Sequence, residues 1–417
     1  MNSGSKPKYK DYLLKDNPFP QTATLEPSSH DPRTSGEIFN DKIFAEEIDD
    51  LWKRIDSKIN VIYVSQASGV WELGIGKSAL VYNVCKSLKE KNEATAVYLR
   101  ASTKSRPSDF CNQIVAKWHS DGYLWEAFRD LLQGYKSSRS SKIPADKIDS
   151  FLQTYKSLPD RVQLRVFTFE REDKVAVDIQ KWAQSRDNSL IPEVTRAFFE
   201  TYLTFPNGFV ERWNGLKVKG NDDIDFFATV LKLLSLTKIA YHYFVIDQFE
   251  DAVRGNQGKN QLANFCSEMR RIIVACAGKA TILVTLHPES EDILSQRGGE
   301  HLIGLAGLDD RHKLDIKEIT RDEAVGLALS YLRYFRLPNT NPKNDLYPLD
   351  DDMVRYVRHI KGGRPRDILQ ALSTAIEVGV QNHCVKLDLE FLKKYHRQVL
   401  GKVLDDDIFK TFKKSVS

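Results

Sequence analysis

Residues 61–80 read VIYVSQASGVWELGIGKSAL, and this stretch decides the expected fold. The β-branched and aromatic run Val61–Val64 predicts a strand, and the apolar spacing that begins at Ala79 predicts a helix. Between them, Gly74-Ile75-Gly76-Lys77-Ser78 matches the phosphate-binding end of a P-loop, which requires a strand, a glycine loop and a helix in this order. The stretch therefore predicts a nucleotide-binding α/β fold.

Each part of the loop has an expected role. The glycines allow backbone N–H groups to approach phosphate oxygens, and the helix N-terminus adds the positive end of its dipole. Lys77 would reach the β- and γ-phosphates, and the Ser78 hydroxyl would bind Mg²⁺. The full P-loop pattern places its first glycine at Trp71, whereas Gly69 comes two residues too early. A chance GxGKS sequence in a glycine turn is the alternative interpretation.

Composition limits the class of protein. The chain has 417 residues, 41% hydrophobic and 28% charged, which predicts two or three structural units with real cores. It contains no apolar run of about 18 residues, and its N-terminal segment lacks the apolar core of a secretory signal. The five cysteines are scattered without C-x-x-C pairs, which argues against a disulfide framework or structural zinc and suits the cytoplasm.

The net charge of +4 is too small to indicate nucleic-acid binding by itself. Lysine and arginine form four local clusters, and each alone is more simply interpreted as a solvated surface. The clusters fall at residues 6–10, 136–142, 393–397 and 410–414.

Strands and helices alternate along much of the chain. After a helix predicted over 41–55, the strand signals that follow the P-loop strand are Ala94–Arg100, Tyr243–Ile246, Thr281–Thr285 and Lys313–Ile319. A helix around Gln261–Cys276 separates two of them. This alternation predicts a parallel sheet with helical crossovers.

The remaining segments are mainly helical or extended. Residues 1–36 are polar and interrupted by prolines, which predicts an extended arm whose Asn17–Pro20 segment could lie across a nucleotide base or anchor the arm. Residues 105–236 carry aromatic side chains at helical spacing, and we interpret these as a helical core, with base stacking as the alternative. Residues 320–417 begin with the capping box Thr320-x-x-Glu323 and contain the helix stop Gly362-Gly363.

A second acidic motif follows the third predicted strand, where residues 243–251 read YFVIDQFED. A buried strand that ends in an acid beside a P-loop strand is a Walker B element, in which Asp247 would hold Mg²⁺. Many P-loop ATPases place a glutamate directly after this aspartate, but here the residue is Gln248, which can orient water without accepting its proton. Glu250 could act as the base if the strand end turns, or Glu250 and Asp251 could merely cap the next turn.

Together these segments resemble AAA+ ATPases, especially the origin-recognition and initiator clade and the related signal-transduction (STAND) NTPases. The resemblance is carried by GIGKS, DQFED, TILVT and the segment GGRPRDIL at residues 362–369. It implies an AAA+-like base formed by 37–104 and 237–319, a helical insertion at 105–236, and a helical lid at 320–417. The 170 residues between Lys77 and Asp247 exceed the usual separation, which is why an insertion is expected.

The resemblance also implies roles for a lid arginine and a strand-end residue. In this clade an arginine at the start of a lid helix, called sensor 2, contacts the γ-phosphate, which points to Arg366 with Arg364 as the competitor. Sensor 1 is a polar residue at the end of the strand after Walker B, which points to Thr285, with His287 as a weaker candidate.

The resemblance further implies an arginine finger, which completes the site of a neighbouring subunit and lies just before the last strand. Arg311 fits this position best and Arg297 is second.

These features predict an ATP- and Mg²⁺-binding molecular switch and a slow or partner-stimulated ATP hydrolase. We expect it to assemble with itself or a partner and to act on DNA through phosphate contacts. A membrane is not expected among its partners. The alternative is a STAND-like signalling or defence NTPase that binds a protein partner through the helical insertion. A kinase acting on a small substrate is a third interpretation, for which we find no substrate acid or base. DNA binding that weakens steeply with salt would separate the first hypothesis from the second.

Overall fold

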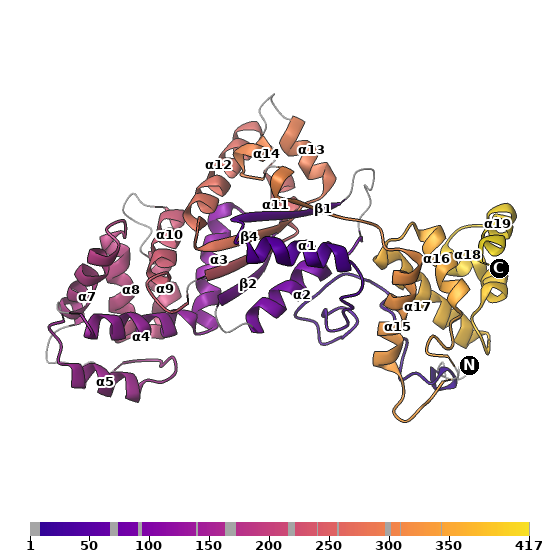
Figure 1. Cartoon of the computed structure of the whole chain (residues 1–417), viewed down its shortest axis with the longest axis horizontal. Helices are drawn as coiled ribbons and strands as arrows, with labels where there is room; N and C mark the ends of the chain where they lie inside the picture. The colour runs from indigo at the N-terminus through magenta and orange to yellow at the C-terminus, as the bar shows by residue number, and fades with distance from the viewer. Residues whose placement is uncertain are drawn as a thin grey trace, which may run out of the picture. The chain divides into compact units, whose positions relative to one another are not determined.

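The computed structural model describes residues 9–66, 74–90, 94–138, 141–162, 172–215, 222–239, 241–256, 258–296, 302–308, 310–342 and 344–416 (Figure 1). The chain divides into two compact units. The first contains Met1–Lys53, Ser65–Asn83 and Leu314–Ser417, and the second contains Arg54–Val64 and Val84–Lys313.

A five-stranded sheet organises the α/β part of the fold, with the strand order β2-β3-β4-β1-β5. Its strands are β1 Val61–Gln66, β2 Ala94–Arg100, β3 Tyr241–Asp247, β4 Ala280–Thr285 and β5 Lys313–Ile316. The pairs β2–β3, β3–β4 and β1–β4 are parallel. Strands β1 and β4 are buried along their whole length, as expected for a parallel sheet covered on both faces. The predicted α/β P-loop fold is therefore confirmed, although β5 ends three residues earlier than the sequence suggests.

Helices connect and cover the strands. They are α1 Ala45–Asp56, α2 Lys77–Glu90, α11 Phe249–Gly255, α12 Lys259–Cys276, α13 Pro288–Gln296 and α14 Leu302–Leu305, with a 3-10 turn η3 at Asp310–His312. Helices α11 to α14 lie close to one another in Figure 1, and α11 and α12 pack on β4. Helix α2 begins at Lys77, directly after the glycine loop, as the P-loop pattern predicts.

The region between β2 and β3 is helical, as predicted. Its helices are α3 Pro107–Ser120, α4 Tyr123–Lys136, α5 Ala145–Thr154, α7 Glu172–Arg186, α8 Pro192–Thr204, α9 Phe209–Gly215 and α10 Asp223–Leu234, with a 3-10 turn η2 at Pro206–Gly208. Helix α3 packs on β2 and also contacts α4 and α9, which link it to the rest of this group (Figure 1).

The aromatic side chains of this region form its core. Trp118, Trp125 and Phe199 are at most 1% exposed, so their faces are not available to nucleic-acid bases. Trp118 stacks on Phe227 with ring centroids 5.9 Å apart, and it meets Phe244 of β3 edge-on at 5.4 Å. One continuous core thus joins the helical region to the sheet. The prediction of a helical core is confirmed, and base stacking by these residues is excluded.

A buried polar chain crosses this core at the start of β2 and β3. The Trp118 indole N–H donates to Thr95 Oγ1 at 3.0 Å, and Thr95 Oγ1 lies 2.8 Å from His242 Nδ1. Burial lowers the pKa of His242 from 6.5 to about 3. The imidazole is therefore neutral in the folded protein at any pH at which the protein is normally handled.

This buried histidine predicts a loss of stability in acid. The unfolded chain binds a proton at His242 near pH 6.5, whereas the folded chain does so only near pH 3, so unfolding is favoured as the pH falls between these values. Between pH 7 and pH 4.5 the free energy of unfolding should fall by about 2 to 3 kcal/mol more in the wild type than in His242→Gln. Urea titrations at the two pH values measure this difference. If the free energy of unfolding depended equally on pH in both proteins, the lowered pKa of His242 would be contradicted.

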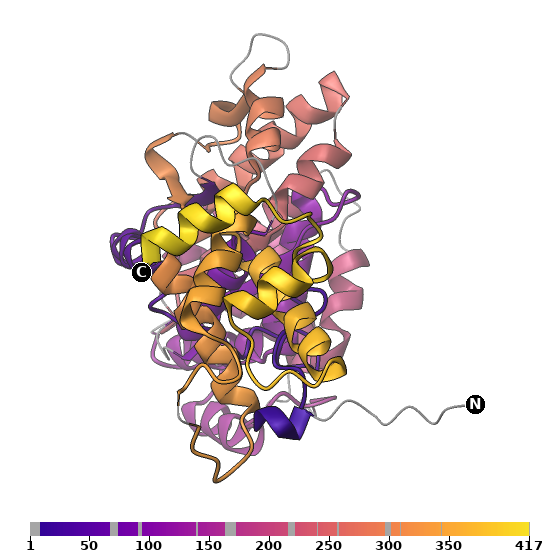
Figure 2. The ribbon, with the colours of Figure 1, turned by 90° about the vertical axis from the view of Figure 1, so that its right-hand side faces the viewer.

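The first unit contains the C-terminal helices. They are α15 Arg321–Phe335, α16 Asp351–Lys361, α17 Pro365–Gln381, α18 Leu389–Leu400 and α19 Asp406–Val416 (Figure 2). The predicted capping box opens α15, where Thr320 Oγ1 accepts from the Glu323 N–H at 3.2 Å and Glu323 Oε2 accepts from the Thr320 N–H at 2.6 Å. Gly362, at φ +70°, ends α16 as predicted.

The N-terminal arm packs on these helices. It begins with the 3-10 turn η1 at Tyr9–Tyr12. Asn17 Nδ2 donates to the carbonyl of Ser373 in α17 at 3.0 Å, and Phe19 is 1% exposed with its ring 6.0 Å from that of Tyr331 in α15. Of the two roles expected for Asn17–Pro20, these contacts favour anchoring of the arm.

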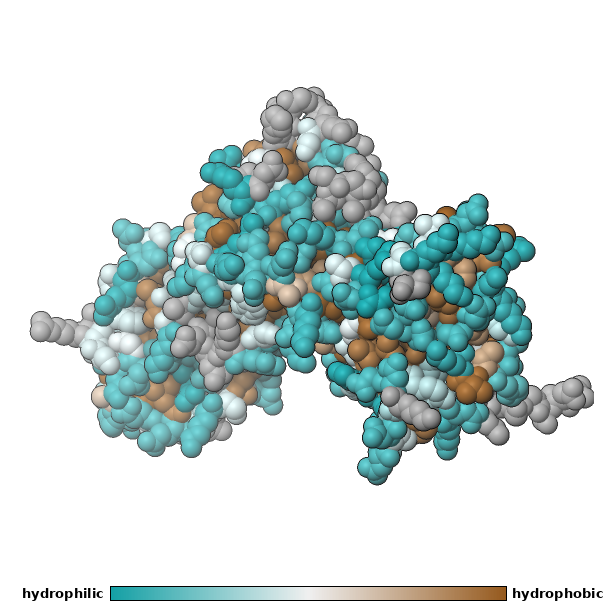
Figure 3. Space-filling view, turned by 45° about the vertical axis from the view of Figure 1, so that its right-hand side comes forward, coloured by the Kyte–Doolittle hydropathy of each residue, from teal (hydrophilic) through white to brown (hydrophobic). Residues whose placement is uncertain are grey.

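Polar side chains cover most of the face in Figure 3, and apolar side chains reach the surface in separate patches. Within the described ranges, no helix combines the length and the apolar character that crossing a membrane requires.

Candidate nucleotide-binding site

The glycine loop carries the predicted phosphate-binding residues. Gly74 and Gly76 adopt φ +100° and +107°, a backbone conformation that favours glycine. Lys77 begins α2 and is 8% exposed, and its Nζ donates to Gln66 Oε1 at the end of β1 over 2.5 Å. Ser78 is in the first turn of α2. The loop thus combines a buried cation, a glycine backbone and a helix N-terminus, which together favour binding of an anionic phosphate.

Gln66, which holds the Lys77 ammonium, was not predicted, although a polar residue at the end of an apolar strand was a usable signal. Trp71 and Gly69, where the P-loop pattern departs from its full form, lie outside the described residues.

The predicted sensor 2 arginine lies against the loop. The backbone N–H of Arg366 donates to the Gly74 carbonyl at 3.2 Å. A Cβ added to Gly74 would be 2.7 Å from Arg366 Cβ, so the side chain also lies close to the loop. A Cβ added to Gly76 would likewise meet the ring of Phe44 at 3.0 Å. A side chain at either position would therefore be strained by its φ angle, and a side chain at Gly74 would also collide with Arg366.

The two candidate arginines differ in their partners. Arg364 forms an ion pair with Asp367, with 2.9 Å between Nη2 and Oδ2, and its Nε donates to the Lys361 carbonyl at 3.0 Å. Arg366 Nε instead donates to the carbonyl of Ala23 in the arm at 3.3 Å. The structure therefore places Arg366, and not Arg364, on the backbone of the glycine loop.

The predicted Walker B aspartate is held at the carboxyl end of the sheet. Asp247 is 2% exposed, and its carboxylate accepts hydrogen bonds from Tyr98 Oη at 2.6 Å and Thr285 Oγ1 at 2.9 Å. Burial, and next the Asp247 charge, raise the pKa of Tyr98 well above its ordinary value, so the phenol remains a donor. The parallel register of β2, β3 and β4 brings these three strand ends together.

Thr285, the predicted sensor 1, is thus brought to Asp247. Its hydroxyl also accepts from the Gln248 N–H at 2.7 Å, so it ties two positions of the acidic motif together. The weaker candidate His287 is buried, and its Nδ1 accepts from the Glu289 N–H at 3.2 Å at the start of α13.

The chain turns sharply after Asp247. Gln248 adopts a left-handed conformation with φ +55°, and its Oε1 accepts from Arg100 Nε at 2.6 Å. Glu250 follows in the first turn of α11 and is 8% exposed, whereas Asp251 lies 3.7 Å from Arg254 in an ion pair. The turn that a catalytic role for Glu250 requires is present.

The structure also locates the expected arginine finger. Arg311 is exposed in η3, directly before β5, and its carbonyl accepts from Arg54 Nη1 at 3.3 Å. Arg297 lies outside the described residues. Tyr98 and Arg100 were not predicted, although polar residues near the end of an apolar strand were a usable signal.

The sheet and these motifs together define an α/β P-loop NTPase fold, in which a glycine loop joins β1 to α2. The solved structure of Cdc6p from Pyrobaculum aerophilum is similar at a TM-score of 0.40 and 10% identity, over 88% of this chain and 69% of that chain. A similarity this low carries no argument about function. No protein-family model matches the sequence, and no curated protein matches it.

Proposed function

We propose that the chain is an ATP-binding, AAA+-like molecular switch. In this proposal it is a slow ATPase that assembles with itself or a partner and acts on DNA. The observation that carries the proposal is the contact between Arg366 and Gly74, which joins a lid helix to a phosphate-binding loop 292 residues earlier in the sequence. A cation at this place is suited to distinguish ATP from ADP, because only ATP has a γ-phosphate.

The nucleotide-binding roles follow from the chemistry of the side chains. Gly74 to Ala79 would bind the phosphates, and Lys77 would exchange the amide oxygen of Gln66 for a phosphate oxygen. Ser78 and Asp247 are the oxygen donors that Mg²⁺ prefers, and the bound ion would neutralise phosphate charge. Tyr98 and Thr285 orient the Asp247 carboxylate through their hydrogen bonds.

Slow hydrolysis follows from the residue after Asp247. The Gln248 amide cannot accept a proton, and Arg100 holds its oxygen at 2.6 Å. The proton that an attacking water loses would have to pass to another group, and Glu250 is the first carboxylate that follows Gln248 in the sequence. Arg311, exposed before β5, would act on the nucleotide of a neighbouring copy, so that assembly raises the rate.

Binding to DNA is supported by exposed cations on the lid helices. Lys393, Lys394 and Arg397 are exposed on α18, and Lys410 and Lys414 are exposed on α19. These side chains would contact phosphates without reading bases.

Fluorescence anisotropy with a labelled duplex, measured with ATP and with ADP, tests the proposed action on DNA. If about three phosphates are contacted, the affinity should fall by about 40-fold between 50 and 200 mM salt. Lys393→Glu with Arg397→Glu should weaken binding and flatten this salt dependence, whereas Lys181→Glu on α7 serves as the matched control. Absence of DNA binding at low salt would reject this part of the proposal and favour a switch that binds protein.

A further inference from the structure

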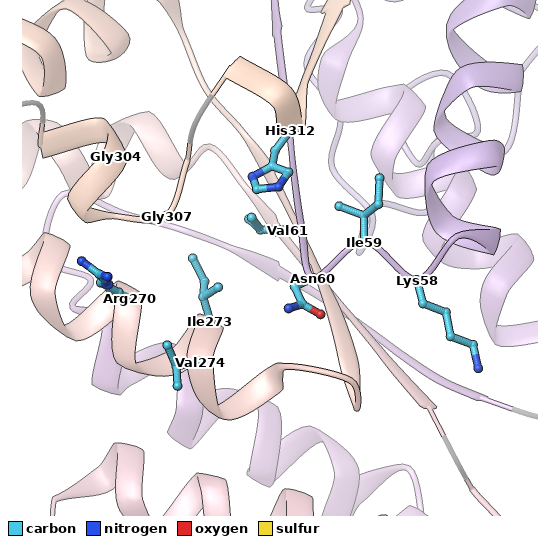
Figure 4. Close-up of a pocket in the computed structure, with 10 residues that line it drawn as sticks. All are labelled: Lys58, Ile59, Asn60, Val61, Arg270, Ile273, Val274, Gly304, Gly307 and His312. Carbon is cyan, nitrogen blue, oxygen red and sulfur yellow. The ribbon is translucent and has the colours of Figure 1, made fainter.

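A pocket of about 510 Å³ opens in the second unit. It is formed by Lys58–Val61, by Arg270, Ile273 and Val274 of α12, and by His312, with backbone from the α14 segment (Figure 4). Val61 begins β1, whereas Asp247 and Thr285 end their strands. Because β1, β3 and β4 run parallel, the pocket lies where these strands begin and the acidic motif lies where they end.

The pocket combines cations with apolar side chains. Lys58 and Arg270 are exposed, and they lie on opposite sides of the lining in Figure 4, with Val61 and Ile273 between them. Val274 is 66% exposed. None of the ten lining residues, all from the described part of the chain, is acidic. A ligand of complementary chemistry would present an apolar side chain next to negative charges.

One described segment of the chain has this chemistry. Residues 403–408 read VLDDDI, in which Val403 is 77% exposed and Ile408 is 42% exposed, and all three aspartates are exposed. Six large apolar side chains are exposed among the described residues; two of them flank these aspartates and a third is Val274 of the pocket.

The shape of the segment is fixed by its own hydrogen bonds. Asp405 Oδ1 accepts from the N–H groups of Asp407 at 3.0 Å and Ile408 at 3.1 Å, which caps α19. The carboxylates of Asp406 and Asp407 lie on the exposed first turn of this helix. A segment that is already ordered loses less conformational entropy when it binds.

We propose that the pocket binds residues 403–408 of a second copy of this chain. Val403 or Ile408 would contact Ile273 and Val274, and the aspartates would face Arg270 and Lys58. The contact is heterologous, because the pocket and the segment are different surfaces, so assembly continues until a ring closes or a filament forms. The inference goes beyond the proposed nucleotide switch and does not depend on it, since neither surface contains a residue of the candidate site.

Sedimentation of the full chain at several concentrations tests the contact. The wild type should associate, and either Arg270→Glu in the pocket or Asp406→Lys with Asp407→Lys in the segment should raise the apparent Kd by about tenfold or more. Lys181→Glu, which makes the same charge change on α7, should leave association unchanged. All these positions are exposed, so circular dichroism should show unchanged folding.

Mixing the pocket variant with the segment variant tests most specifically whether the two surfaces bind each other. The pocket variant keeps an intact segment and the segment variant keeps an intact pocket, so an equimolar mixture should form mixed dimers and stop there. A monomeric wild type, association that neither variant weakens, or a mixture without mixed dimers would each overturn the proposal. ATP affinity measured on the same samples should be unaffected by the variants, so a failure of nucleotide binding is recognised separately.

Discussion

Asp247→Ala should lower Mg²⁺-dependent ATP turnover by about 100-fold or more. The carboxylate is 2% exposed and is oriented by Tyr98 and Thr285, so the metal would lose a fixed anionic ligand at the end of β3. Steady-state turnover over a range of Mg²⁺ concentrations measures the effect. The dependence of ATP affinity on Mg²⁺ should disappear as well.

Two further variants separate the loss of metal binding from loss of structure. Asp247→Ala leaves the buried Thr285 hydroxyl and the half-buried Tyr98 hydroxyl without an acceptor, which alone costs up to about 1–3 kcal/mol of stability for each unsatisfied group. Asp247→Asn retains an acceptor oxygen but removes the charge, and it should lose turnover while it melts closer to the wild type. Tyr98→Phe keeps the carboxylate and should retain most of the activity. Full Mg²⁺-dependent turnover by Asp247→Asn would show that the acidic motif is misassigned.

Lys77→Ala should weaken ATP binding by about tenfold or more, or at least about 1.4 kcal/mol. Lys77 is the cation fixed at the start of α2, where the residue is 8% exposed and its ammonium is held by Gln66. Without it, the β- and γ-phosphates lose a point charge in a partly desolvated position. Isothermal titration calorimetry measures the affinity.

Lys86→Ala is the matched control for this variant. Lys86 is exposed on the same helix, so its removal changes the net charge equally without touching the glycine loop. Its affinity for ATP should remain within about twofold of the wild type, because an isolated surface charge contributes little. Unchanged ATP affinity in Lys77→Ala would end the P-loop assignment.

Local patterns predicted the fold well because the relevant side chains act over short distances along the chain. The apolar runs at Val61–Val64 and Thr281–Thr285 are buried as β1 and β4, and the capping box at Thr320 opens α15. The glycine loop followed by Lys77 is likewise a local signal. The end of β5 was less predictable, since residues 317–319 continue the strand-like pattern after the sheet pairing stops.

Contacts between distant segments were not predictable in this way. Tyr98 reaches Asp247, and Arg100 reaches Gln248, only because the register of β2 and β3 aligns residues about 150 positions apart. The same register places Thr95 beside His242. The choice between Arg364 and Arg366 also required three-dimensional packing, since both flank the same proline.

Calorimetry with ATP and ADP tests most directly whether Arg366 registers the γ-phosphate. The Arg366 N–H contact with Gly74 survives truncation of the side chain, so Arg366→Ala should keep the loop in place while it removes the cation. Arg364→Ala, which removes the ion pair with Asp367 and the hydrogen bond to the Lys361 carbonyl, is the matched control and should change either affinity by about 0–1 kcal/mol.

We expect Arg366→Ala to lower the preference for ATP over ADP by about tenfold, or about 1.4 kcal/mol, while ADP affinity stays within about twofold. An equal loss of affinity for ATP and ADP would contradict this expectation, because the arginine would then support the loop without sensing the γ-phosphate.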